Sequence, residues 1–174
     1  PAASLAPASA ARIPFTKVVL TASADGDVMV KSVTVERQGV GTDAALDEVV
    51  LLDEDGIQVG LGKTLNSNHQ VILNEPFTVK AGTSRTMSLG ASRPASDSTS
   101  VAGQIIRLAL VAVDSGSAAV HGSLPIVGNG MTMNATLTLG SVTNQTGSFK
   151  TVATTTEDIG KTAFKFTSVR ITAG

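Results

Sequence analysis

Apolar and polar residues alternate through residues 15–22 of this 174-residue chain, and the same pattern returns near its other end. Residues 15–22 read FTKVVLTA and residues 166–173 read FTSVRITA, with five identities in eight positions and no gap. The two copies share an apolar residue at every second position over their last five residues. A period of two predicts a half-buried β-strand. The chain is therefore expected to contain two versions of one strand.

Short runs with the composition of β-strands fill most of the sequence between these copies, and no stretch has a convincing helical period. Gly, Asn and Asp turns separate them at short, regular spacing, which is typical of an antiparallel sandwich. We predict an all-β fold, an antiparallel β-sandwich of the Ig-like or jelly-roll-like kind, in which a strand from a neighbouring subunit could complete a sheet. The predicted strands are 28–37, 49–52, 57–61, 71–73, 77–79, 85–89, 104–113 and 131–139.

Several local features refine this prediction. The DEDG run at 53–56 predicts a hairpin turn. Ile106, Leu108 and Leu110 are expected to share the buried face of a central strand. The apolar phase changes within 28–37, which a β-bulge near Lys31 would explain.

The chain divides into three parts on this interpretation. The Ala-, Pro- and Ser-rich residues 1–14 are predicted to be an extended lead-in or linker. Residues 15–155 form the sandwich, with 141–148 as a polar loop, and 156–174 carry the repeated terminal strand, either a donor strand or the start of a next repeat.

The duplication has three explanations. The chain could be a piece of a tandem array, cut after a second domain begins. Alternatively, one sandwich has a place for one of the two strands, and the other strand completes a neighbouring subunit by strand addition. Chance similarity between two amphipathic strands is the third. Under strand addition, the residues that mediate polymerisation are Phe15, Val18 and Leu20 of the first copy and Phe166, Val169 and Ile171 of the second.

Composition excludes several classes of protein. The chain has no Cys, so disulfides and thiolate metal sites are absent. Only 16% of residues are charged, with a net charge of −1, which argues against a partner made of nucleic acid. No apolar run is long enough for a spanning helix, so membrane insertion is not expected. With no Trp or Tyr for sugar stacking, a carbohydrate-binding module is a weaker alternative.

Candidate chemical sites are few. Asp25, Asp27, Asp53 and Asp55 lie in Gly-containing turns and are candidate calcium ligands, although such turns need no metal. No other metal or cofactor is expected. Asn134 and Asn144 begin glycosylation sequons.

Catalysis is not expected from this sequence. The histidines, His69 and His121, have no other ligand or nucleophile at a diagnostic spacing. We therefore predict no catalytic residues and no enzyme activity.

The phrase FTVKAGTSRTMSL at 77–89 is the most characteristic part of a longer succession of strands, DG turns and loops. This succession resembles the β-sandwich repeat domains of prokaryotic cell-surface and surface-layer proteins. The resemblance covers most of the chain. It implies an extracellular, non-catalytic, assembling protein and supplies no catalytic residues.

These observations predict a structural subunit of an extracellular filament or surface assembly. Its partners would be copies of itself, joined by β-strand exchange. The expected location is the cell surface, after an export signal has been removed, since the opening residues do not form an intact signal peptide. The alternatives are one domain of a tandem-repeat surface-layer or adhesin protein, and a carbohydrate-binding sandwich.

Overall fold

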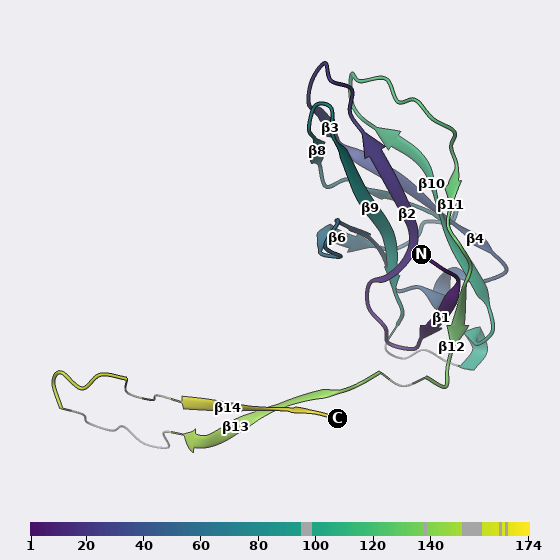
Figure 1. Cartoon of the computed structure of the whole chain (residues 1–174). Coiled ribbons are helices and arrows are strands. Elements are labelled where there is room, and N and C mark those ends of the chain that lie inside the picture. The colour runs from purple at the N-terminus through teal and green to yellow at the C-terminus, as the bar shows by residue number, and fades with distance from the viewer. Residues whose placement is uncertain (95–98, 138, 151–157, 164, 166) are drawn as a thin grey trace. The chain divides into compact units, whose positions relative to one another are not determined.

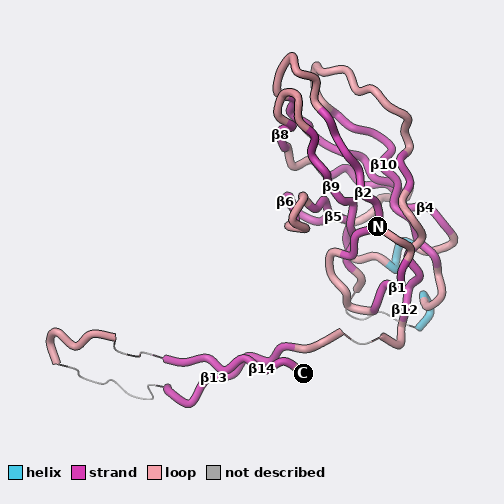
Figure 2. Tube along the Cα trace, in the orientation of Figure 1, coloured by secondary structure: helices cyan, strands magenta, loops and turns pink. Residues whose placement is uncertain are grey.

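The protein is built almost entirely of β-strands, as the computed structural model shows (Figure 1). The structure describes residues 1–94, 99–137, 139–150, 158–163, 165 and 167–174. These residues contain no α-helix, and their two helical turns are the 3-10 helices η1 (Asp43–Ala45) and η2 (Thr99–Val101) (Figure 2). The predicted all-β fold and antiparallel sandwich are confirmed.

Two compact units divide the chain, Pro1–Thr138 and Leu139–Gly174. The first unit contains the sandwich. Its larger sheet has the order β1 (Ser4–Pro7), β12 (Met131–Asn134), β10 (Ile105–Asp114), β4 (Ser32–Gly39) and β7 (Gln70–Leu73), with β11 (Ile126–Val127) also beside β10. The second sheet has the order β2 (Ile13–Thr21), β9 (Ser84–Ser92), β5 (Glu48–Leu52) and β6 (Gln58–Lys63). A small pair joins β3 (Val28–Val30) to β8 (Phe77–Val79).

The core lies between the two main sheets because each presents the apolar side of its alternation to the other. The predicted face of β10 is fully buried, with Ile106, Leu108 and Leu110 all at 0% exposure. They share one apolar cluster with Val18 of β2 and Leu89 of β9 from the opposite sheet. Every buried apolar side chain that the structure describes lies between residues 6 and 133. The first unit therefore holds the described core.

The strand β2 uses a bulge to bury more than its alternation alone would. Its pairing with β9 shifts between Pro14 and Thr16, which leaves Phe15 as the extra residue. Phe15 and Thr16 are consequently both buried, at 0% and 1% exposure, although they are adjacent. Val18 and Ala22 are buried beyond the bulge, as the sequence predicts.

The break in apolar phase near Lys31 has a different cause from the predicted bulge. The chain there leaves one sheet for another, because β3 pairs with β8 whereas β4 pairs with β10 and β7. Val30 and Val33 remain buried on the two sides of the break. A change of sheet therefore resets the phase, and the bulge prediction was wrong.

Residues 1–14 contain more pairing than the predicted lead-in. Residues 4–7 form β1, which runs parallel to β12, and β2 already begins at Ile13. Ala6 is fully buried, and its carbonyl accepts a hydrogen bond from the buried guanidinium of Arg93. Residues 4–7 join the sheet although their small side chains give no strong alternating pattern, and for this reason the sequence did not predict the strand.

Near its start, β2 lies close to the larger sheet at Gly128. The amide of Gly128 donates to the carbonyl of Leu108 at 3.2 Å, and the hydroxyl of Thr16 donates to the same carbonyl. A Cβ atom on residue 128 would overlap the Thr16 hydroxyl and the Phe15 carbonyl. Glycine is therefore required here for close approach of the backbone.

Gly128→Ala is expected to lower the free energy of unfolding by about 1–3 kcal/mol, because the added methyl group must push β2 away from β10. Urea denaturation measures the effect. Gly26→Ala is the control, since a Cβ at residue 26 would meet no atom within 4 Å. Equal stability of the two variants would contradict the close approach.

Candidate functional site

The second unit is a two-stranded hairpin of β13 (Val142–Lys150) and β14 (Thr167–Ala173). β14 is the described part of the second copy of the repeated strand, and Phe166 lies outside the described residues. The sequence predicts a polar loop at 141–148, but these residues largely form β13. The prediction was wrong because a strand in a two-stranded hairpin outside the core does not need an alternating apolar face.

One face of this hairpin collects its apolar side chains. In the antiparallel register, Val142 lies opposite Ala173, and Asn144 and Thr146 lie opposite Ile171 and Val169. Directly paired residues lie on the same side of a sheet. Val142, Val169 and Ile171 are 65%, 68% and 66% exposed. We call the side formed by Val142, Val169, Ile171 and Ala173 the hairpin apolar face.

The two copies of the repeated strand therefore occupy opposite environments. Val18 of the first copy is 3% exposed, whereas the equivalent Val169 is 68% exposed. Leu20 packs against the core while Ile171 does not. An isolated two-stranded hairpin is at best marginally stable in water, and three strands or a packed face are normally needed. The hairpin apolar face is thus a surface that can gain stability from a partner.

Two of the four candidate calcium ligands, Asp27 and Asp53, use their carboxylates as hydrogen-bond acceptors within the protein. The Asp53 carboxylate accepts hydrogen bonds from the amides of Asp55 (3.0 Å) and Ile57 (2.8 Å), which shapes the predicted hairpin turn between β5 and β6. Asp27 accepts from Lys80 Nζ at 2.6 Å and from the amide of Ala81 at 2.9 Å. The Lys80 hydrogen bond lowers the pKa of Asp27.

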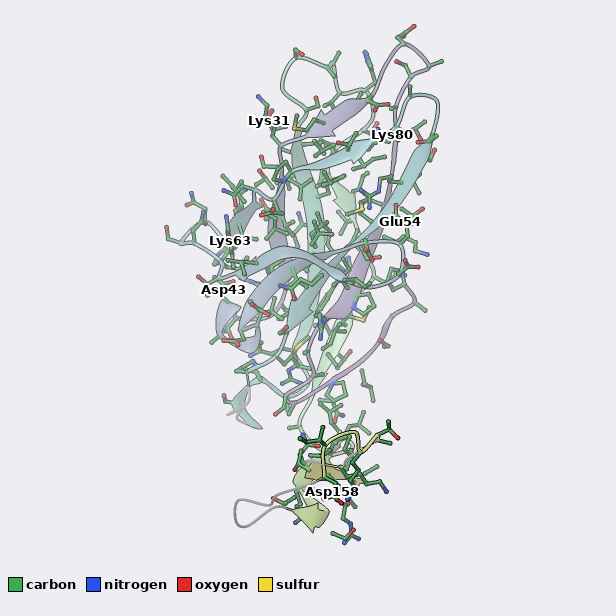
Figure 3. The ribbon with its side chains drawn as sticks, turned by 90° about the vertical axis from the view of Figure 1, so that its left-hand side faces the viewer. Lys31, Asp43, Glu54, Lys63, Lys80 and Asp158 are labelled. Carbon is green, nitrogen blue, oxygen red and sulfur yellow. The ribbon has the colours of Figure 1, made fainter. Side chains whose placement is uncertain are left out.

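Asp43, Glu54 and Lys80 lie at separate places on the sandwich (Figure 3). In the described part of the chain, no group of three or more His, Cys, Asp or Glu side chains could hold a metal ion. Asp25, another of the four calcium candidates, is exposed near the end of β2.

His69 belongs to a small polar cluster with Asp43 and Arg37. The Asp43 carboxylate lies 2.7 Å from Nδ1 of His69 and pairs with the guanidinium of Arg37, which is buried. Desolvation opposes ionisation of Asp43, but these hydrogen bonds outweigh it and lower its pKa. Arg37 also donates to the carbonyl of Gly41 at 2.6 Å. The cluster thus fastens the loop after β4 to the sandwich.

The two sequons lie in different units. Asn134 ends β12, and its side-chain oxygen accepts from the amides of Thr136 (2.9 Å) and Leu137 (2.7 Å). This turn stops the strand predicted to continue to residue 139, so Leu137 is 44% exposed. Asn144 is an exposed residue of β13.

An ion pair with well-formed geometry holds the β5–β6 turn against β9. Glu54 accepts from Nε and Nη2 of Arg85 at 2.8 and 2.9 Å, and the Arg85 guanidinium lies 5.4 Å from the centroid of the Phe77 ring. The Arg85 hydrogen bond lowers the pKa of Glu54 from 4.5 to about 2.

Glu54→Gln is expected to flatten the acid end of the stability profile. Because the pKa of Glu54 is lower in the folded state, its ion pair contributes above pH 4.5 and is lost as the pH falls to about 2. Glu54 is 41% exposed, so the contribution is about 0.2–1 kcal/mol. Thermal melting between pH 2 and 7 should show a smaller loss of Tm in the variant, and parallel profiles would contradict this role.

None of the described helices is long and apolar enough to cross a membrane. Comparison with protein-family models finds no match, and neither known curated proteins nor solved structures show a significant similarity to the chain. The functional argument therefore depends on the residues themselves, and above all on the hairpin apolar face.

Proposed function

We propose that this protein is a structural subunit of an extracellular filament or surface assembly, and that copies of it join by β-strand addition through the C-terminal hairpin. The observation that carries the proposal is the exposure of Val169 and Ile171 in a second version of a strand whose first version is buried. Burial of each of these side chains by a partner would contribute about 1.5–3 kcal/mol of stabilising free energy. A partner copy can supply the missing cover.

Strand addition also suits the main chain of the hairpin. β14 pairs with β13 on one edge and has no described strand on its other edge. Such an edge offers unpaired amide and carbonyl groups to a further strand. Main-chain hydrogen bonds would supply affinity, while the alternating side chains would select the partner. The resemblance of the sequence to prokaryotic surface domains supports the proposed placement outside the cell.

Val169→Asp combined with Ile171→Asp is expected to abolish assembly and leave a folded monomer. Analytical ultracentrifugation and electron microscopy measure assembly, and circular dichroism measures folding. The matched control combines Gln145→Asp with Thr172→Asp, which adds the same two negative charges on the opposite face of the hairpin. Normal assembly of the first variant, or a wild-type protein that stays monomeric at all concentrations, would contradict the proposal.

The tandem-array alternative differs in one measurable quantity. If the copies are joined within a single polypeptide, the protein from its natural source would run far above 17.6 kDa on a denaturing gel. Copies joined by strand addition would give that mass after denaturation.

A further inference from the structure

The strands β2 and β10 both end at the same end of the sandwich (Figure 1). A groove of about 570 Å³ is lined there by residues of both strand ends. Its floor is apolar and comprises Val28 and Val30 of β3, Val79 of β8 and Val113 of β10. The end of β2 and the segment after β10 form its two rims. We call this feature the β2–β10 groove.

The rims of the β2–β10 groove include two strand edges that lack a strand partner in the described sheets. β2 pairs with β9 alone and is therefore the edge of its sheet. Beyond Leu110, β10 pairs only with β4, because β11 and β12 accompany its earlier residues. Nearer the start of β2, Gly128 and Thr16 connect the two sheets through the carbonyl of Leu108. The sheets are therefore joined at one end and leave the groove at the other.

We propose that the β2–β10 groove accepts β14 of a second copy of the chain, with Val169 and Ile171 directed onto its apolar floor. This inference rests on the proposed function, because it names the surface of the sandwich on which strand addition occurs.

The occupant is argued from sequence and from charge. β14 is a near-copy of the end of β2, and β2 shows that this sequence packs against this core, since Val18 and Ala22 are buried. Its own apolar side chains are exposed in the hairpin. On the opposite face of β14 lies the exposed cation of Arg170, and Asp25 lines the groove with the opposite charge.

Thiol cross-linking tests the site directly, since the chain has no Cys of its own. A protein with Ala119→Cys in the groove rim is mixed with a protein carrying Ile171→Cys and oxidised mildly. The expected product is a covalent dimer of twice 17.6 kDa. Leu61→Cys is the matched control. Leu61 is 81% exposed and lies on β6, which forms the edge opposite β2 in the four-stranded sheet. Cross-linking at Leu61 equal to or above that at Ala119 would overturn the groove assignment.

A blocking experiment separates this inference from the proposed function. Ala119→Trp, with Ala118→Trp as a second blocking variant, is expected to fold but not to polymerise. Mixed with the Val169→Asp, Ile171→Asp protein, it is expected to form dimers, because one partner keeps β14 and the other keeps the groove. Thermal melting checks the fold, and sedimentation measures the dimer.

The outcomes distinguish the two proposals. A wild-type protein that never assembles overturns the proposed function and the groove together. Wild-type assembly with equal assembly of a folded blocking variant overturns the groove alone. A monomer in which β14 fills its own groove would also overturn the proposal. A chain that carries both Ala119→Cys and Ile171→Cys would then form an internal cross-link, and the mixture of the two single-Cys proteins would give no dimer.

Discussion

Val18→Asp is expected to lower the free energy of unfolding by about 3–5 kcal/mol, whereas Val169→Asp is expected to change it by about 0.5 kcal/mol or less. The two residues occupy equivalent positions in the two copies of the strand. Val18 is 3% exposed within the core, so a carboxylate there loses its water without gaining a partner. Val169 is 68% exposed, so its replacement remains hydrated.

Urea denaturation of dilute, unassembled protein measures both changes. Lys17→Asp is the control within β2, because Lys17 is exposed on the outer side of the strand and should tolerate a carboxylate. Comparable destabilisation by Val18→Asp and Val169→Asp would mean that both copies belong to a core in solution. The division of roles between the two strands would then be wrong.

The fold could be predicted where one side of a strand is buried and the other is not. Ile106, Leu108 and Leu110 show this, because burial on one face imposes a period of two that the sequence displays. The turn at 53–56 could be predicted equally well, because such turns favour Asp and Gly. The Asp53 carboxylate accepts a main-chain hydrogen bond there, and Gly56 adopts a positive φ of 76°.

The failures arise where burial does not impose a period. The described side chains of the polar strand β13 include no buried apolar residue, so nothing in residues 142–148 distinguishes it from a loop. β1 contributes one buried residue, Ala6, which leaves no pattern. At Lys31 the chain changes sheets, and a change of sheet and a bulge produce the same shift of phase.

The candidate site was predictable in part for the same reason. Comparison of residues 15–22 with 166–173 identifies Val169 and Ile171 without any structure. Their assignment to a hairpin outside the sandwich depends on β13, which the sequence did not indicate. The β2–β10 groove depends on four separate segments that meet only after folding, so no local pattern announces it.

Truncation after residue 138 is expected to leave a folded sandwich that no longer assembles. All described buried apolar side chains lie between Ala6 and Met133, so the shortened chain keeps them, and its Tm should lie within a few degrees of that of the unassembled full-length protein. It loses β13 and β14, and with them the hairpin apolar face. It keeps the β2–β10 groove.

The truncated protein should consequently terminate growth when it is added to full-length subunits, because it can accept a strand but cannot donate one. Increasing its share should shorten the assemblies seen by electron microscopy. A truncated protein that unfolds would show that the hairpin contributes to the core. One that folds and still polymerises would place the contacts between copies within the sandwich and exclude β14 as the connecting strand.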